Sequence, residues 1–417
     1  MSSRQVEATP GVIPFPQRPT GSRGGRPARI KPGRVEVVVM DDFREIAETV
    51  AGSYERQAWE QLAENALEPN PFYEPWMLLP ALKYLTAASA VRLVFVYVSN
   101  GEQRVLCGLF PLELHASYNG LGTRLPFKTL SLWKHKYCYL CTPLIHRDYA
   151  RECMSAFFEW LNEADHGAPL AEFGYVPGEG PFHQLLVESV SERAAFSFTI
   201  ESFTRAMFRP KASAEAYLAA ALPGIKRKEF RRQENRLAEK GRLEYAELKE
   251  AGELESWIEE FLALEAVSWK GQEGRALVSK AEDRAFFVEA ARAAFARGRL
   301  MMLALRVGPV PVAHKCNFIA GRGSFAFKIA YEDSYAKFSP GVLLEIDNIR
   351  RLHERAGVDW MDSCANADNS MINRLWTDRL AVEYVLVGTG KAPGDLIVSG
   401  IGMLKWMNRR LRPKAKR

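Results

Sequence analysis

The stretch that starts at Leu300 constrains the fold most, because its pattern changes from strand to helix in a fixed order. Apolar or alternating runs at Leu300–Arg306, Val310–Ile319 and Ser324–Tyr331 are typical of strands, and glycine-containing turns separate them. A polar loop follows, and Val342–Arg355 then has the apolar spacing of a helix. We therefore predict antiparallel hairpins whose last strand leads through a turn into an amphipathic helix.

Ser339, Pro340 and Gly341 stand at the start of this helix. A glycine there lets the backbone approach a ligand closely, and the free N–H groups of a helix start suit an anion such as a diphosphate. The same three residues also fit an ordinary helix start, with Ser339 as the capping side chain and Pro340 in the first helical position. The local sequence leaves both interpretations open.

The string FKIAYEDSYAKFSPGVLLEIDNI, residues 327–349, resembles the signature of the CelD-type acetyltransferases that are linked to cellulose biosynthesis. That family belongs to the GNAT superfamily and is related to the FemAB-like aminoacyl transferases. The resemblance covers roughly residues 35–390, although the sharp motif lies in this one string. It implies an acyltransferase with two GNAT-like halves that uses acetyl-CoA or another acyl-CoA as co-substrate and no metal.

The resemblance also implies where the donor binds. Pantetheine is expected along the Ser324–Tyr331 strand, and the diphosphate at the loop that leads into the next helix. The cofactor-binding residues implied in this way are Lys328, Ile329, Ala330, Tyr331, Lys337, Phe338, Ser339, Pro340, Gly341 and Val342.

The chain has 417 residues, which is more than one typical domain holds and suits two. With the resemblance, the predicted fold class is α/β (α+β): tandem GNAT-like domains, each a mixed, mainly antiparallel sheet flanked by helices. The expected boundaries are a disordered basic tail at 1–33, a degenerate N-terminal GNAT-like domain at 34–208, the C-terminal acyl-CoA-binding GNAT domain at 209–390, and a basic, amphipathic tail at 391–417.

The N-terminal half carries a weaker copy of the central pattern. A hairpin turns at Asn100, and Pro143 precedes a helix as Pro340 does in the second half. The copy lacks the glycine after its proline, which disfavours close approach of the backbone to a diphosphate. We expect this half to shape the acceptor cleft rather than to bind the acyl donor.

The composition, with 47% hydrophobic and 25% charged residues, is that of a globular protein. No apolar run approaches the length of a membrane span and no early segment resembles a signal peptide, so we expect a cytoplasmic location. The six cysteines are scattered, and the CxxC spacing of Cys138 and Cys141 has no second pair, which leaves a closed zinc site unsupported. We expect reduced, mostly buried thiols.

The net charge of +6 is mild, and much of the basic excess lies in the two tails and in the segment Gly224–Gly241. Three interpretations of that basic helix are open: a solvated helix with local ion pairs, a ridge that attracts anionic CoA or the acceptor, and a contact with tRNA. The N-terminal tail fits a solvated segment or a polyanion-binding arm. The C-terminal tail fits disorder, packing on the domain, or peripheral contact with anionic lipid.

Acyl transfer from a thioester needs a held donor, a hydrogen bond to the carbonyl oxygen, and a base for the acceptor. His314 lies on the strand before the donor strand, and because an unperturbed histidine titrates near neutral pH it is a candidate base or a structural histidine. Asp362 stands where the FemAB-like relatives also place an aspartate, and it is a candidate base, acceptor orienter or loop cap. Cys316 and Cys364 are weaker candidates, as nucleophiles of a covalent acyl-enzyme.

The predicted function is transfer of an acetyl or longer acyl group from acyl-CoA to an amine or hydroxyl of an unknown acceptor (a saccharide, an amine or a peptide), in exopolysaccharide or cellulose biosynthesis. Nucleic acid is not an expected partner. Two alternatives stay open: a FemAB-like aminoacyl transferase that uses charged tRNA, and a non-catalytic GNAT scaffold that binds a partner. The first requires salt-sensitive RNA binding, and the second tolerates changes at Gly341 and Asp362.

Overall fold

The computed structural model describes residues 33–41, 46, 53–86, 91–101, 103–118, 124–163, 166–268, 271, 273–390 and 393–400. The predictions for the N-terminal tail before residue 33 and for the C-terminal tail beyond residue 400 lie outside these residues. Within the described ranges, no helix is long and apolar enough to cross a lipid bilayer.

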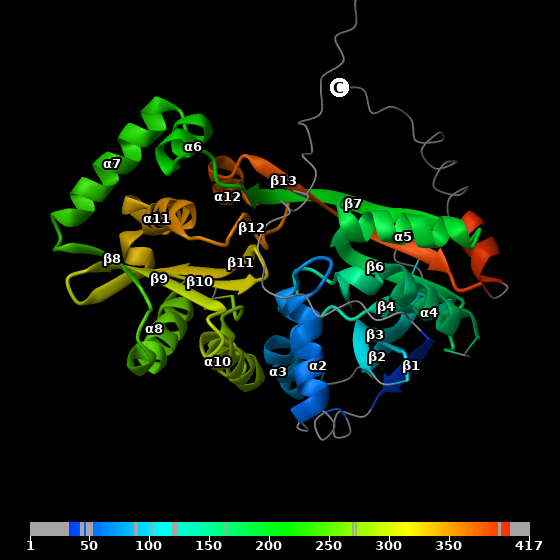
Figure 1. Ribbon diagram of the computed structural model, residues 1–417. Helices are drawn as coiled ribbons and strands as arrows, with labels where there is room; N and C mark the ends of the chain where they lie inside the picture. Colours follow the sequence, from blue (N-terminus) through cyan, green and yellow to red (C-terminus); the bar gives the residue numbers. More distant parts are fainter. Residues whose placement is uncertain are drawn as a thin grey trace, which may run out of the picture.

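The described strands form one continuous sheet that carries helices on both faces (Figure 1). The strand order is β1-β2-β3-β4-β6-β13-β7-β12-β11-β10-β9-β8, and β5 pairs with β3 beside this path. The strands are β1 (Arg34–Met40), β2 (Val91–Ser99), β3 (Arg104–Tyr118), β4 (Arg124–Leu132), β5 (Leu144–Ile145), β6 (Leu170–Pro177), β7 (Ser197–Phe208), β8 (Leu243–Glu247), β9 (Leu300–Val307), β10 (Val310–Ala320), β11 (Gly323–Tyr331), β12 (Trp360–Asp362) and β13 (Asp378–Gly388).

The α-helices are α2 (Ser53–Glu64), α3 (Pro75–Leu85), α4 (Ala150–Glu163), α5 (Pro181–Glu192), α6 (Ala214–Ala221), α7 (Gly224–Ala238), α8 (Leu254–Val267), α10 (Ala281–Phe295), α11 (Pro340–Glu354) and α12 (Ser370–Leu375). Short 3-10 helices are η1 (Pro71–Tyr73), η2 (Arg147–Tyr149), η3 (Ala251–Glu253), η4 (Leu277–Ser279) and η5 (Asp333–Phe338).

Most strand pairs are antiparallel, and two are parallel: β4 with β6 in the first half, and β11 with β12 in the second. A parallel pair needs a crossover connection, which α4 supplies in the first half and α11 in the second. The predicted fold class, a mixed and mainly antiparallel sheet flanked by helices, is thereby confirmed.

The strands of the central stretch form as predicted. β9, β10 and β11 make two consecutive hairpins that turn at Gly308 and Gly321, and both glycines have positive φ. Glycine suits these turns because no Cβ obstructs a left-handed backbone. The polar loop that follows contains the short helix η5, which the sequence pattern did not indicate, and α11 then starts at Pro340.

The last strand, β13, does not stay with the second half of the chain. It lies between β6 and β7 and pairs antiparallel with both of them. A strand from the end of the chain thus completes the sheet of the first half, and the division at residues 208 and 209 remains a proposal.

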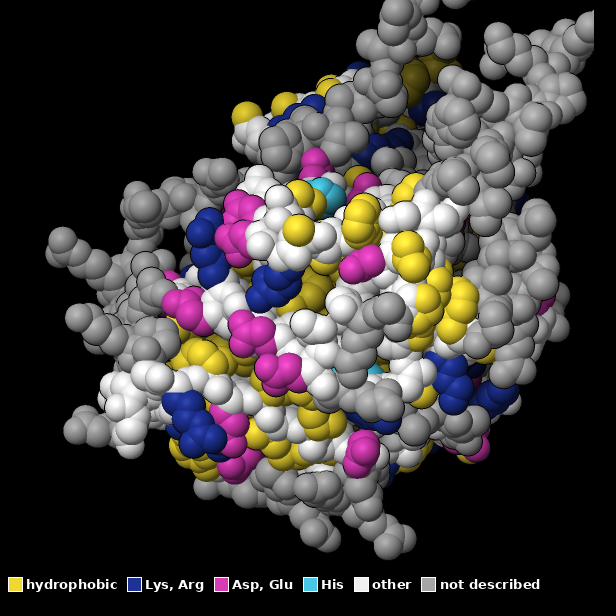
Figure 2. Space-filling view, turned by 90° about the vertical axis from the view of Figure 1, so that its right-hand side faces the viewer, with side chains coloured by type: hydrophobic (Ala, Val, Ile, Leu, Met, Phe, Trp, Pro, Cys, Tyr) yellow, Lys and Arg dark blue, Asp and Glu magenta, His cyan; other side chains and the backbone are white. Residues whose placement is uncertain are grey.

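The two halves meet through buried aromatic side chains. Phe72 of η1 packs edge-to-face on Phe325 of β11, with ring centroids 5.7 Å apart. Trp76 of α3 lies 5.3 Å from the ring of Phe318 on β10. At the opposite, outer end of the first half, acidic, basic and apolar side chains are interspersed on the surface (Figure 2). These aromatic contacts therefore join η1 and α3 of the first half to β10 and β11 of the second.

Candidate functional site

The site is built where β11 separates from β12. The parallel ladder between them runs only from Gly323 opposite Trp360 to Phe325 opposite Asp362. On the other edge of β11, the register with β10 shifts so that Phe327 is an extra, bulged residue. Beyond Phe325, no described strand lies beside the edge of β11 that faces away from β10. The sheet therefore opens at this point.

A cavity of 380 Å³ occupies this opening. β11 contributes its lining from Ala326 to Ile329, and the loop after β12 contributes residues 363–366. Tyr139 of the first half closes one side. Lys315 of β10 and Glu345 of α11 also line the cavity, so it reaches the helix that follows the donor strand. Residues from both halves of the chain thus surround one polar cavity.

The start of α11 adjoins this cavity. A Cβ built on Gly341 would lie 3.3 Å from Tyr331 Cδ1 and 3.8 Å from Ile329 Cδ1. Ile329 also lines the cavity, so it connects the open edge of β11 with the helix start. Of the residues implied as cofactor-binding, Lys328 and Ile329 line the cavity, whereas Ile329, Tyr331 and Gly341 come together at the helix start.

Ser339 does not cap α11 with its side chain. The prediction that Ser339 is the capping residue of an ordinary helix start is therefore wrong. A capping serine normally has extended backbone, whereas Ser339 has φ 53° and ψ 47°, and its hydroxyl makes no capping hydrogen bond. Its carbonyl oxygen instead accepts hydrogen bonds from Val342 N–H and Leu343 N–H. Pro340 occupies the start of the helix as predicted. No serine hydroxyl therefore competes with an anion at this helix start.

Two buried ion pairs stand in the cavity wall. Lys315 Nζ lies 2.8 Å from Glu345 Oε2, and Asn348 Nδ2 donates to Glu345 Oε1 at 2.8 Å. Lys328 Nζ donates to Glu265 Oε1 of α8 at 2.6 Å. Lys315 and Glu345 were not among the site residues predicted from the sequence. The sequence did contain a signal for this pair. Lys315 stands inside an apolar strand and Glu345 on the apolar side of a helix, and charged residues are seldom buried without a partner.

Asp362 is fully buried and does not line the cavity. Its Oδ2 accepts a hydrogen bond from Arg205 Nη2 at 2.5 Å, and its Oδ1 accepts one from Cys364 N–H at 3.0 Å. The second bond fixes Cys364, whose φ of 51° is unusual for a residue with a side chain. Burial raises the pKa of the Cys364 thiol, and the Asp362 carboxylate raises it further. That environment opposes a thiolate nucleophile.

His314 lies on the face of β10 that α8 covers, and it is not among the lining residues of the cavity. Its Nε2 is 3.3 Å from Glu260 Oε2, and its ring packs edge-to-face on Trp257 at 5.3 Å. Burial lowers the pKa of His314. The hydrogen bond from His314, together with Arg306, lowers the pKa of Glu260 to about 2. The structure therefore places the two predicted catalytic residues, His314 and Asp362, beside the cavity wall rather than in it.

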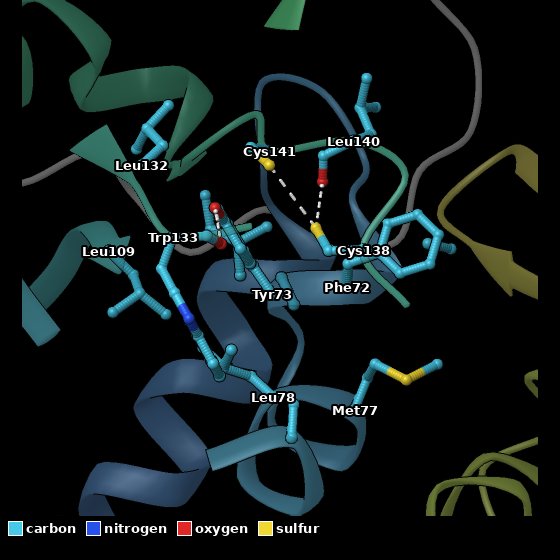
Figure 3. Packing of buried hydrophobic residues seen from close by; sticks show 14 of the residues in the cluster. Phe72, Tyr73, Met77, Leu78, Leu109, Leu132, Trp133, Cys138, Leu140 and Cys141 are labelled. Atoms are coloured by element: carbon cyan, nitrogen blue, oxygen red, sulfur yellow. Dashed lines mark hydrogen bonds between the residues drawn. The ribbon is translucent and has the colours of Figure 1, made fainter. Parts of the chain in front are cut away.

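In the first half, the chain itself fills the corresponding opening. After β4, the segment that follows Trp133 folds back, and Cys141 N–H donates to Tyr175 O of β6 at 2.9 Å. Tyr73 Oη donates to Trp133 O at 2.9 Å (Figure 3). Cys138 Sγ donates to Leu140 O at 3.0 Å and lies 3.6 Å from Cys141 Sγ. All six cysteines are free and buried, as expected. This filling supports the expectation that the first half does not hold the donor.

Comparison with known proteins agrees with this geometry. Residues 225–369 match the family model described as an acetyltransferase (GNAT) domain. No curated protein matches the chain. The crystal structure of FemX is similar, with a TM-score of 0.51 and 9% identity over 80% of this chain and 95% of that one.

Two further solved structures are similar. A conserved protein of unknown function from Bacteroides thetaiotaomicron has a TM-score of 0.49, with 11% identity over 85% of this chain and 99% of that one. A tandem GNAT protein from the clavulanic acid biosynthesis pathway has a TM-score of 0.41, with 12% identity over 86% of this chain and 100% of that one. The second half of the chain thus contains a GNAT-type acetyltransferase domain, in a chain whose fold is similar to that of FemX.

Proposed function

We propose that the protein transfers an acetyl or longer acyl group from acyl-CoA to an amine or hydroxyl acceptor. One contact supports this proposal above the others: Ile329 both lines the cavity and packs beside Gly341 at the start of α11. A donor with a reactive thioester at one end and a diphosphate further along needs a cavity that adjoins an anion site. The GNAT match over residues 225–369 agrees with this proposal.

The open edge of β11 is the proposed path for pantetheine. An extended chain with amide groups can lie along a strand edge that no other described strand occupies, as peptides do when they extend a sheet. The diphosphate is proposed to lie at the start of α11, where Gly341 has no side chain and the helix dipole favours an anion. Lys337 and Phe338, in η5, precede that start.

The thioester supplies an acyl carbon that is open to a nucleophile. In the proposed step, the acceptor nitrogen or oxygen bonds to this carbon, the C–S bond breaks, and the acceptor proton passes to a protein base while the CoA sulfur leaves. The groups proposed for the proton are His314 and Asp362, as predicted, and Glu345, whose carboxylate lines the cavity. Comparing kcat for His314→Gln, Asp362→Asn and Glu345→Gln separates them.

The finer parts of the proposal rest on the resemblance of residues 327–349. They are a cytoplasmic enzyme, a saccharide, amine or peptide acceptor, and a place in exopolysaccharide or cellulose biosynthesis. Aminoacyl transfer from charged tRNA is the second candidate, because the chain shares its fold with FemX and carries the basic helix α7. Charged tRNA is therefore a second donor to test.

Calorimetry with acetyl-CoA tests the donor site. We expect a dissociation constant in the micromolar range for the wild type, in line with common KM values. Gly341→Glu should abolish binding, because its carboxylate repels a diphosphate and its side chain meets Tyr331. Gly252→Glu is the matched control, since a side chain at the exposed Gly252 meets no atom within 4 Å. Circular dichroism and a thermal melt check that each variant is folded.

Binding that is lost only in folded Gly341→Glu supports the donor site at α11. If the wild type binds neither acetyl-CoA nor longer acyl-CoAs, the proposed function is wrong. Binding that survives in Gly341→Glu would place the donor elsewhere. If no acyl-CoA binds, charged tRNA is the next donor to titrate. The titration is done at low and high salt, because phosphate contacts make RNA binding salt-dependent.

A further inference from the structure

A groove on the outer side of α11 plays no part in the cavity described above. Its volume is 150 Å³, and residues of α6, α7 and α11 line it. Figure 1 shows these three helices on one side of the second half. The floor is apolar and includes Leu218 and Leu222 from α6 and its end, Phe230 from α7, and Leu343 and Ile346 from α11. Leu218, Leu222 and Leu343 are buried, and Phe230 is partly exposed. A flat apolar group can therefore rest on this floor.

Three exposed arginines stand around this groove: Arg227 and Arg231 of α7, and Arg350 of α11. Across the described part of the chain, none of the three has an ion-pair partner within 4.0 Å or a side-chain hydrogen bond. The nearby carboxylates have hydrogen-bond partners of their own: Glu234 accepts the Tyr245 hydroxyl at 2.6 Å, and Asp347 accepts Arg351 Nε at 2.6 Å. Arg350 attracts the Asp347 carboxylate only from beyond ion-pair distance.

The acidic residues do not cancel this positive charge. α7 has six basic residues and two acidic ones. One of the acidic residues, Glu229, accepts a hydrogen bond from Lys226 Nζ at 2.8 Å. Glu215 lies at the α6 side of the groove and is exposed to solvent. An arginine cluster that is not paired within the protein is suited to a phosphate, because each guanidinium offers several donors in one plane.

Two residues that line the groove, Leu343 and Ile346, follow Gly341 closely on α11. At a rise of 1.5 Å per residue, Leu343 and Ile346 lie about 3 and 8 Å along the helix axis from Gly341. α7 also packs against η5, the segment that leads into α11. A ligand whose diphosphate lies at Gly341 therefore has this groove within about 8 Å along the helix axis. Besides the diphosphate proposed at Gly341, a second anionic group of the same ligand could pair with the three arginines.

We infer that this groove binds the 3′-phosphoadenosine end of the donor, with the base on the apolar floor and the 3′-phosphate among Arg227, Arg231 and Arg350. The inference rests on the proposed function, because it assigns the far end of the same donor molecule. It makes the 3′-phosphate a recognition element. The enzyme then selects free acyl-CoA over donors that carry only phosphopantetheine, such as an acyl carrier protein.

The chemistry of the groove explains why this ligand fits. Adenine is flat and largely apolar on its faces, so it gains from contact with leucine and phenylalanine side chains. The 3′-phosphate carries charge that pairs with guanidinium groups in charge-assisted hydrogen bonds. A carrier protein would place folded protein where the nucleotide lies, and a groove of 150 Å³ between α6, α7 and α11 has no room for that. The apolar floor and the basic rim are both used by one small molecule.

The test compares CoA with dephospho-CoA, which lacks only the 3′-phosphate, by calorimetry on the full chain. We expect the wild type to bind dephospho-CoA about tenfold more weakly or worse, since one tenfold step is about 1.4 kcal/mol and a charge-assisted contact exceeds it. The double variant Arg231→Gln/Arg350→Gln should bind both ligands with nearly equal affinity. Its affinity for dephospho-CoA should match that of the wild type.

Arg232→Gln is the matched control, because it removes the same charge from α7 but does not line the groove. It should keep the wild-type discrimination. Equal binding of CoA and dephospho-CoA by the wild type would overturn the inference and leave the proposed function intact. Discrimination that persists in the double variant would also overturn it, because the 3′-phosphate is then recognised elsewhere. If neither ligand binds, the proposed function itself fails.

A second binding measurement uses RNA as the ligand. A short RNA with the tRNA acceptor-end sequence should not bind detectably at physiological salt. If it binds and the double variant loses that binding, the groove belongs to an RNA partner and the inference is overturned. Folding should not confuse these outcomes, because both substituted arginines are exposed and leave the apolar floor unchanged.

Discussion

At the residue scale, the buried Lys315–Glu345 pair is the feature on which the interior of the site depends most. The two side chains are only 3% and 1% exposed, and Asn348 adds a hydrogen bond to the carboxylate. Removing one member of such a pair leaves an uncompensated charge in a medium that solvates it poorly. Neither Lys315 nor Glu345 can therefore be replaced alone without a loss of stability, whether or not the pair takes part in catalysis.

Glu345→Gln should lower the free energy of unfolding by about 3–5 kcal/mol, the usual result of breaking a buried pair from one side. The double variant Lys315→Met/Glu345→Leu should lose much less than the two single variants together, because no lone charge remains. Urea unfolding of all variants measures this. Glu255→Gln, which breaks the exposed pair with Arg292, is the control and should have a far smaller effect. A loss for Glu345→Gln no larger than for this control would contradict the prediction.

The same scale shows which site residues a sequence can indicate. Ile329, Tyr331 and Gly341 were implied together, and they meet because one strand, one turn and one helix start connect them. The environments of His314 and Asp362 were not predictable, because their partners Glu260 and Arg205 lie 54 and 157 positions away in the chain. A motif carries local geometry but not the groups that other elements bring to it.

At the element scale, the start of α5 is completed by a distant segment of the chain. α5 begins after Gly180, which offers no capping side chain. Glu68, from the segment after α2, accepts a hydrogen bond from Phe182 N–H in the first turn of α5 at 2.9 Å. Glu68 is buried, and this burial raises its pKa to about 7. A carboxylate from one element thus caps a helix of another, and its protonation affects stability.

Glu68 makes stability fall as the pH rises from about 4.5 to 7. Below this window both the folded and the unfolded states hold the proton, within it only the folded state does, and above it neither does. The full cost at pH 8 is about 3 kcal/mol, at 1.36 kcal/mol for each unit of the pKa difference. Glu68→Gln cannot ionise and keeps an acceptor oxygen, so its stability relative to the wild type should rise by about 2–3 kcal/mol between pH 5 and pH 8.

Urea unfolding of both proteins at pH 5 and pH 8 measures this change. Glu192→Gln, at the exposed end of the same helix, serves as the control for loss of a carboxylate. An unchanged difference between Glu68→Gln and the wild type at the two pH values would show that burial does not shift the Glu68 pKa upward.

At the scale of the whole molecule, β13 makes the two halves depend on one another. β6 and β7 are not paired with each other, and β13 fills the space between them. Without β13, both strands would present unpaired edges, which invite aggregation. The buried contacts of Phe72 with Phe325 and of Trp76 with Phe318 join the halves a second time. The halves resemble two domains in topology but share their strands and core.

The fragment 34–208 should therefore fail to fold alone, although its boundaries match a predicted domain. We expect weak secondary structure by circular dichroism and aggregation in size-exclusion chromatography, compared with a monodisperse 34–400 fragment. Supplying residues 370–400 as a separate chain should restore soluble, folded material if β13 is the missing element. A soluble and cooperatively unfolding 34–208 fragment would contradict this prediction.

The sequence by itself determined the strand–loop–helix order from Leu300 to Arg355, the mixed fold class and the GNAT resemblance. These features follow from local apolar periodicity and from a motif of 23 adjacent residues, so no distant contact is needed to recognise them. Only the tertiary structure decided that β13 joins the first half, that Lys315 faces Glu345, and that α7 lies beside α11. The physical reason is that these contacts join residues far apart in the chain, and packing rather than local preference selects them.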